Sequence, residues 1–319
     1  MNDSLRIPER VIPIPEHLSP EAKAVLAAPR PEGAGYPALD DVEGWRQRIA
    51  AMDVMVMQMF AGRLGGAKCS YRELAEGEAR GYEIIPEGVA AGDRRVYLDI
   101  HGGALIMGAG EVCKTMATAS ATTHRVRTVA VDYRMPPDHP YPVPLDDCVA
   151  FYRALLRDHA PREIIVGGGS AGGNLCAAML LRARDEGLPM PAAAVLSTPE
   201  VDLTESGDTH QTNAGIDAMG SLMQANLLYA AGADLTDPYV SPLFGDFTKG
   251  FPPTIITAGT RDLFLSNAVR MHRKLRAARV AAELHIVEAA AHGNFGGAPE
   301  DAELAEELRS FCEAKWSGR

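Results

Sequence analysis

The sequence predicts an α/β fold in which a mostly parallel sheet is covered by helices on both faces. Short apolar stretches with strand character alternate with stretches of helical periodicity, an arrangement typical of parallel sheets. The predicted strands are residues 81–86, 95–100, 127–132, 163–167, 192–197, 253–258 and 283–288. With 319 residues, 46% of them hydrophobic, the chain is long enough for one large core and a small additional unit.

The N-terminal segment is predicted to precede the sheet, which begins at residues 81–86. Residues 1–35 are rich in proline and charge, which favours extended chain interrupted by a short helix. From Asp40 a longer helix is predicted, because apolar residues recur there at helical spacing. These residues are Trp45, Ile49, Met52, Val56 and Met59. Such a stripe more often packs in a core than holds a ligand, so we expect it to need an apolar partner elsewhere in the chain.

A glycine-containing turn follows the predicted strand at 95–100. Its residues are His101-Gly102-Gly103-Ala104. Acyl transfer develops an oxyanion, which requires backbone N–H groups held at its eventual position. We expect the N–H groups of Gly102 and Gly103 to belong to this oxyanion hole, because glycine lets the backbone approach a substrate closely. The N–H of Ala171, which directly follows the candidate nucleophile Ser170, is expected to be the third donor. The alternative is an ordinary strand-to-loop turn. His101 is expected to be a structural hydrogen-bonding residue rather than the base.

A G-x-S-x-G pattern follows the predicted strand at 163–167. Gly168, Ser170 and Gly172 form the pattern, and a helix-compatible run begins at Leu175. Between a strand and a helix, this pattern indicates a nucleophile elbow, a strained turn that presents the serine hydroxyl. Small neighbours are required because the strand and helix backbones pass close to the serine. Ser170 is therefore the candidate nucleophile.

The candidate bases are the histidines in the last fifth of the chain, His272, His285 and His292. His272 lies in a predicted helix, and His285 lies in the predicted strand at 283–288. His292 follows that strand on a loop, and loops at strand ends collect the catalytic groups of open α/β sheets. We therefore predict that His292 is the general base.

The acid that orients the base is expected after the preceding strand. Asp262 occupies this place, in the loop after the predicted strand at 253–258. There it would orient His292 and stabilise the imidazolium that forms during the reaction. The alternative is that Asp262 only caps a helix beginning near Phe264. Three other acidic residues lie in turn-like or strand-interior positions and are poorer candidates. These are Asp237, Asp246 and Glu288.

Several further motifs accompany these residues from about residue 80 to the C-terminus. In chain order the set is His101-Gly102-Gly103, Val131-Asp132-Tyr133-Arg134, Pro137-Asp138-His139-Pro140-Tyr141-Pro142, Gly169-Ser170-Ala171-Gly172-Gly173-Asn174-Leu175, Asp202-Leu203-Thr204, Asp237-Pro238-Tyr239-Val240-Ser241-Pro242-Leu243, Gly259-Thr260-Arg261-Asp262 and His292. With these motifs the chain resembles the bacterial hormone-sensitive-lipase-like esterases, also called family IV lipolytic enzymes. It departs from the family pattern at Ala104, where a third glycine is usual, and at Gly169, where Asp or Thr is usual.

This resemblance implies an α/β-hydrolase with a helical cap that hydrolyses carboxylic esters without a cofactor. We expect residues 1–60 to form an N-terminal cap segment and residues 61–319 to form the catalytic domain. A cap insertion is expected near 203–236, where predicted strands and helices no longer alternate. Within this insertion, apolar residues predict a helix at 219–229. Side chains of this helix, suited to an acyl or alcohol group of modest size, are predicted to bind substrate. They are Met219, Met223 and Leu227.

Three functions are compatible with these residues. The first is a serine carboxylesterase acting on short to medium acyl esters through an acyl-enzyme. The second is an amidase or arylformamidase, because the same nucleophile and oxyanion hole would serve an amide bond. The third is a non-catalytic small-molecule-binding protein, as in the plant gibberellin receptors, which resemble this family but lack a working base. The presence of His292 together with Ser170 and Asp262 disfavours the third.

Composition disfavours several other functions. A net charge of −11 makes nucleic acids and anionic membranes poor partners. The nine histidines and five cysteines show no metal-ligand spacing such as H-E-x-x-H or Cys-x-x-Cys, so no metal or cofactor is expected. Scattered cysteines in odd number, and a start without a basic stretch followed by an apolar one, predict a cytoplasmic protein. An exposed edge strand at 283–288 would favour a homodimer, and the sequence leaves the oligomeric state open.

Overall fold

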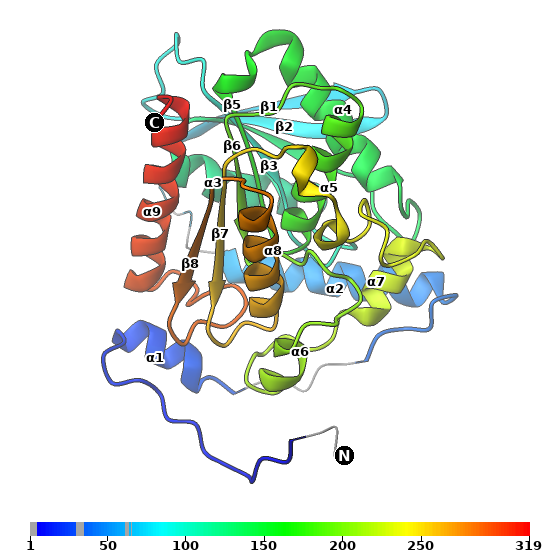
Figure 1. The fold of residues 1–319 in the computed structure, drawn as a ribbon, viewed down its shortest axis with the longest axis vertical. Coiled ribbons are helices and arrows are strands. Elements are labelled where there is room, and N and C mark those ends of the chain that lie inside the picture. Colours follow the sequence, from blue (N-terminus) through cyan, green and yellow to red (C-terminus); the bar gives the residue numbers. More distant parts are fainter. Residues whose placement is uncertain (1–4, 30–34, 61–63, 65) are drawn as a thin grey trace.

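The computed structural model describes residues 5–29, 35–60, 64 and 66–319. These residues form an eight-stranded sheet with the strand order β1-β2-β4-β3-β5-β6-β7-β8 (Figure 1). The β1–β2 and β2–β4 pairs are antiparallel, and the other neighbouring pairs are parallel. The strands are β1 (Cys69–Glu76), β2 (Ala79–Pro86), β3 (Val96–Ile100), β4 (Arg127–Asp132), β5 (Ile164–Gly169), β6 (Ala193–Ser197), β7 (Thr254–Gly259) and β8 (Ala282–Val287).

Helices cover both faces of this sheet, as predicted. Helices α3 and α9 pack against one face, and α4, α5 and α8 pack against the other (Figure 1). Helices α6 and α7 belong to the long connection between β6 and β7. The α-helices of the described residues are α1 (Pro20–Ala27), α2 (Val42–Phe60), α3 (Glu111–His124), α4 (Val143–Asp158), α5 (Ala171–Asp185), α6 (Thr209–Thr212), α7 (Met223–Ala230), α8 (Leu265–Ala277) and α9 (Pro299–Trp316).

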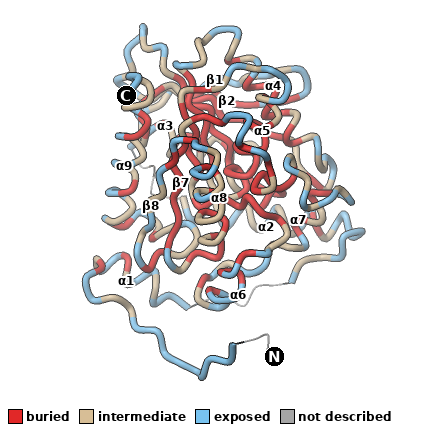
Figure 2. Tube along the Cα trace, in the orientation of Figure 1, coloured by how far each residue is buried: buried red, intermediate tan, exposed pale blue. Residues whose placement is uncertain are grey.

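The alternation of side chains along each strand supplies the two halves of the core. In β5, Ile164 and Val166 enter the cluster beneath α4, α5 and α8, whereas Ile165 enters the cluster beneath α9. This is the period of two that a strand imposes, with apolar residues at both parities because both faces are covered. Figure 2 shows the central strands buried and much of the chain before α2 exposed. In the described residues, no helix combines the length and apolar character needed to span a bilayer.

The predicted strands are all present, with ends within two residues of the expected positions. Strand β1 was not predicted, because its exposed and intermediate residues carry no clear apolar alternation. It is held by its antiparallel pairing with β2, through a turn that contains Gly77 at φ 63°. The apolar helix predicted at 219–229 starts only at Met223. Before that point, the N–H of Leu222 bonds to Glu205 and the N–H of Met219 bonds to Asp217, so these groups are taken up by carboxylates outside the helix.

The stripe on α2 packs against the connection that contains α7, as expected. We call this packing the Trp45 cluster, and its buried residues are Trp45, Ala104, Ile106, Met107, Leu222, Ala225, Leu263 and Phe264. Ile49, Met52 and Val56 pack against it as partly buried residues. The prediction was wrong for Met59, which is 53% exposed. The cluster therefore joins α2, the β6–β7 connection and the loop that follows β3.

Trp45→Ala is expected to lower the free energy of unfolding by about 3–5 kcal/mol, because truncation of a buried aromatic side chain loses packing and leaves a cavity. Met59→Ala on the same helix is the matched control and should change it by less than about 0.5 kcal/mol. Urea unfolding followed by circular dichroism measures both. Equal losses in the two variants would contradict the packing of α2 described here.

Candidate active site

Ser170, Asp262 and His292 meet at the C-terminal edge of the parallel strands. They follow β5, β7 and β8, respectively. His292 Nε2 lies 3.0 Å from Ser170 Oγ, and His292 Nδ1 lies 3.2 Å from Asp262 Oδ1. An ionised carboxylate only accepts hydrogen bonds, so Nδ1–H donates to Asp262 and the Nε2 lone pair faces the Ser170 hydroxyl. The structure thus brings together the three residues predicted for the triad.

Ser170 occupies a strained turn between β5 and α5. Its φ is 54°, in the left-handed region that non-glycine residues rarely adopt. The turn is possible because its neighbours lack side chains. A Cβ on Gly172 would lie 1.9 Å from the carbonyl oxygen of Ile100, and one on Gly168 would lie 2.4 Å from the Gly172 carbonyl carbon. The glycines of the G-x-S-x-G pattern are therefore required by backbone contacts on both sides of the serine.

Asp262 is fully buried. Its Oδ1 accepts the hydrogen bond from His292 and also one from the backbone N–H of Phe264, 2.8 Å away, just before α8 begins. Phe264 itself is the N-cap residue of α8, and this helix has no side-chain cap. Asp262 therefore contacts the base and fixes the turn before α8, since one carboxylate oxygen has two acceptor sites, but it does not cap the helix.

Several charges act on His292. Burial lowers its pKa, whereas the charge of Asp262, the hydrogen bond to it and the charges of Asp217 and Glu200 raise it. The net result is a His292 pKa above its ordinary value of 6.5. The site therefore favours the imidazolium form, which is the form created when the base accepts a proton.

The three predicted oxyanion-hole residues lie at the serine turn and in the loop after β3. Gly102 approaches the elbow so closely that a Cβ there would lie 2.9 Å from the Gly169 carbonyl oxygen. Gly103 has a φ of 130°, which favours glycine. Among the turn and loop backbone hydrogen bonds of the described residues, none is donated by Gly102, Gly103 or Ala171. Within the described residues, these N–H groups are thus not taken up by such backbone bonds, as an oxyanion hole requires.

His101 supports this loop rather than the chemistry. Its Nδ1 lies 2.8 Å from the Gly102 carbonyl oxygen, and its ring stacks on Tyr133 at a centroid distance of 4.1 Å. One donor atom each from His101, Cys113 and Asp132 lies within 4.8 Å of the others. Cys113 already donates to the Val131 carbonyl and Asp132 accepts the N–H of Gly110, so we interpret this group as packing beneath the loop.

Two acidic residues at the site were missed by sequence reasoning. Glu200 follows β6, at the same edge as the triad, and burial raises its pKa to about 8. Its position after a predicted strand could have revealed it. Asp217 lies in the β6–β7 connection and accepts the backbone N–H of His292. No local motif marks Asp217, because it reaches the triad only through the folding of an irregular segment.

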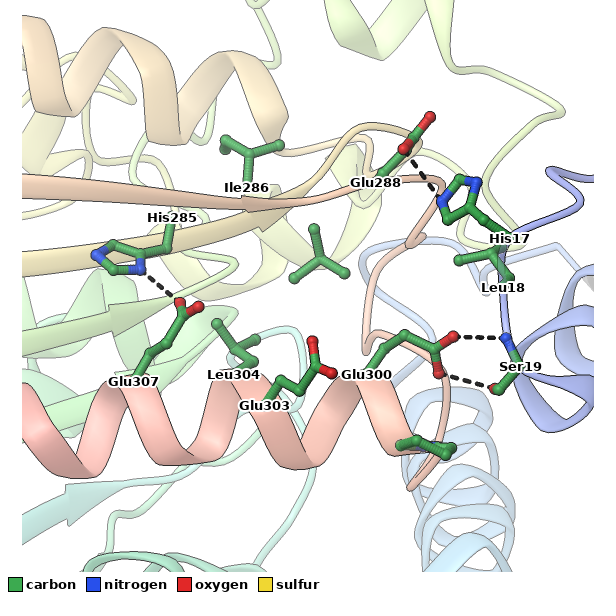
Figure 3. A pocket seen from close by; sticks show the side chains of 12 residues that line it. His17, Leu18, Ser19, His285, Ile286, Glu288, Glu300, Glu303, Leu304 and Glu307 are labelled. Atoms are coloured by element: carbon green, nitrogen blue, oxygen red, sulfur yellow. Dashed lines mark hydrogen bonds and ion pairs between the residues drawn. The ribbon is translucent and has the colours of Figure 1, made fainter.

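The other candidate histidines lie elsewhere. His272, on α8, has its Nε2 3.3 Å from the Ala282 carbonyl oxygen. His285 borders a cavity of about 550 Å³ between β8, α9 and the chain before α1, where it faces Glu307 (Figure 3). The same cavity is bordered by His17, which pairs with Glu288. No triad residue lines this cavity, so it is separate from the candidate active site.

The comparison with known proteins agrees with this geometry. Residues 97–296 match a family described by the alpha/beta hydrolase fold. The chain belongs to this α/β-hydrolase family. An esterase of Acinetobacter venetianus is 34% identical over 206 residues, which are 63% of this chain and 67% of that protein. The predicted fold class is thereby confirmed.

Comparison with solved structures indicates which kind of α/β-hydrolase the chain resembles. The crystal structure of an esterase, E25, superposes with a TM-score of 0.90 at 34% identity, covering 97% of this chain and 98% of that one. An esterase from the bacterial hormone-sensitive lipase family superposes with a TM-score of 0.78 at 28% identity, covering 93% and 99%. The predicted resemblance is confirmed, and the chain is an esterase of this type.

Gly172→Ala is expected to abolish esterase activity, because the added methyl group would collide with the Ile100 carbonyl and displace the elbow. Gly169→Ala is the matched control. Its Cβ would meet nothing nearer than 3.7 Å, at a φ outside the left-handed region, so the variant should stay active and gain about 0.4–1 kcal/mol of stability. Thermal unfolding and turnover of p-nitrophenyl butyrate check both, and an active Gly172→Ala enzyme would refute the contact.

The pH dependence of kcat/KM should report the ionisation of His292, which must be neutral to accept the serine proton. Because its pKa is raised, activity should be lost as the pH falls through a value above 6.5, and should be restored as the pH rises. His285→Ala is the control and should leave this profile unchanged. A wild-type profile with its midpoint below 6.5 would be inconsistent with the charges around His292.

Proposed function

We propose that this esterase is a serine carboxylesterase that hydrolyses short to medium acyl esters through an acyl-enzyme. The observation that carries the proposal is the continuous hydrogen-bond path from Ser170 through His292 to Asp262, at 3.0 and 3.2 Å. A serine hydroxyl is a weak nucleophile at neutral pH and needs an adjacent base that is itself oriented by a third group. All three groups are present in the required order.

In the first half of the proposed reaction, Ser170 Oγ attacks the ester carbonyl carbon and its proton passes to His292 Nε2. The carbonyl oxygen becomes an oxyanion that accepts hydrogen bonds from the N–H groups of Gly102, Gly103 and Ala171. As the tetrahedral intermediate collapses, the ester C–O bond breaks and His292 returns the proton to the leaving alkoxide. The acyl group stays on Ser170.

In the second half, a water molecule replaces the alcohol. His292 removes a proton from this water, which attacks the acyl carbon and forms a second tetrahedral intermediate in the same oxyanion hole. Collapse of this intermediate breaks the bond to Ser170 Oγ, which recovers its proton from His292, and the carboxylic acid leaves. Asp262 stays ionised throughout and stabilises the imidazolium in both halves.

We also propose that residues 1–60 and the insertion near 203–236 act as a cap over the catalytic part, residues 61–319. The support is the Trp45 cluster, which packs α2 and the insertion against the loop after β3. Met219, Met223 and Leu227 are the proposed substrate contacts. Met219 packs against the Trp45 cluster, whereas Met223 and Leu227 are partly buried on α7. A cap held by large apolar side chains would limit the length of the acyl chain.

Ser170→Ala should reduce kcat on p-nitrophenyl butyrate by roughly 10⁴-fold or more, because the covalent intermediate can no longer form. A fluorophosphonate should label the wild type at Ser170 and leave the variant unlabelled, as read by peptide mass spectrometry. Labelling at another residue, or substantial turnover by the variant, would disprove the assignment of the nucleophile.

A panel of substrates tests the bond type and the acyl length together. We would compare p-nitrophenyl esters from acetate to palmitate with p-nitroanilides of the same acids. The proposal requires highest kcat/KM on the short to medium esters. Higher kcat/KM on the anilides would favour the amidase alternative, and highest kcat/KM on palmitate would contradict the proposed limit on acyl length.

A further inference from the structure

Asp217 connects three segments that meet at the candidate active site. It belongs to the β6–β7 connection, is 4% exposed and accepts three backbone hydrogen bonds. Its Oδ2 accepts the N–H of Leu263 at 2.9 Å and the N–H of His292 at 3.0 Å. Its Oδ1 accepts the N–H of Met219, also at 2.9 Å. One carboxylate therefore holds the loop of the acid, the loop of the base and its own segment.

Neighbouring residues of the same connection strengthen this link. Asn213 donates from its amide to the carbonyl oxygens of Thr260 and Asp262. Thr209 donates to the Leu263 carbonyl oxygen and accepts the N–H of Ser266. The connection thus satisfies donors and acceptors on both sides of Asp262. Asp217 is the member of this group whose bonds also include His292.

We propose that Asp217 is a positioning residue for the base, tying the β6–β7 connection to the loops of Asp262 and His292. This inference rests on the proposed function, in which His292 is the base. The two backbone donors on Oδ2 hold His292 and Leu263, the residue after Asp262, on one oxygen. The N–H of Arg261 also donates to the Ala290 carbonyl at 2.9 Å, which joins the two loops just before these residues. The shared acceptor adds the link at the base itself.

The charge of Asp217 also acts on His292, together with the other charged groups around the imidazole. Asp262 faces it from the loop after β7, Glu200 from the segment after β6 and Asp217 from the connection. The ring of Phe264 meets the imidazole edge to face at 4.9 Å and adds no charge. Loss of the Asp217 carboxylate should therefore lower the pKa of His292, since one of the negative charges that raise it is removed.

The deciding variant is Asp217→Asn, which keeps the size of the side chain and removes one acceptor oxygen and the charge. Asp208→Asn is the matched control, because Asp208 lies in the same connection but is exposed and makes no side-chain cap at α6. With p-nitrophenyl butyrate, Asp217→Asn should lower kcat by about 10- to 100-fold with little change in KM, as expected for a small misplacement of a catalytic group. The rise of kcat/KM with pH should also move to lower pH.

The control variant should match the wild type in both measurements. An unchanged kcat in Asp217→Asn, or an unchanged pH profile, would overturn the proposal, because a merely structural acceptor would not move the ionisation of the base. A variant that fails to unfold cooperatively would also overturn it, since Asp217 would then be needed for folding. Failure of the proposed function is distinguishable, because it would show as fluorophosphonate labelling away from Ser170 in the wild type.

Discussion

The candidate active site depends on a close backbone contact between the end of β3 and the start of α5. Gly172 approaches the Ile100 carbonyl, and Gly102 approaches the Gly169 carbonyl, at distances that exclude a Cβ. Strands β3 and β5 are parallel neighbours, so their C-terminal turns emerge side by side. The separation of the nucleophile from the N–H donors is therefore set by two backbones in contact. Such donors need no reorganisation when the oxyanion forms.

The buried carboxylate of Asp262 beside the His292 imidazole is the second constraint. Asp262 is completely buried, and its Oδ2 accepts no hydrogen bond from the described residues. A buried carboxylate with one oxygen left without a partner is costly, and the cost is relieved when His292 gains a proton. The site is thus more complementary to the ion pair of the proposed reaction than to the resting state. Interactions accelerate a chemical step only when they are stronger in the transition state than in the ground state.

The fold and the meeting of Ser170, His292 and Asp262 could be predicted because their signals are local in the sequence. Apolar runs mark the covered strands, and Ser170, Asp262 and His292 each lie in the turn or loop that follows one of them. Parallel pairing then brings these strand ends to one edge. Strand β1 could not be predicted, because its exposed and intermediate residues lack an apolar pattern and its stability comes from pairing with β2. Asp217 could not be predicted either, since its partners lie 46 and 75 positions away along the chain.

The connection between β6 and β7 therefore contributes in two physically different ways. Through Leu222 and Ala225 it packs against Trp45 by non-directional apolar contact, which tolerates changes of shape at modest cost. Through Asp217 it holds the loops of Asp262 and His292 by directional hydrogen bonds. A buried donor left without its acceptor carries a full desolvation penalty, so these bonds tolerate little change. Under the proposed cap function, changes on the apolar side should alter which acyl groups are accepted while the hydrogen bonds of Ser170, His292 and Asp262 persist. Changes at the carboxylate should alter the rate for every ester alike, because they act on the base that all substrates share.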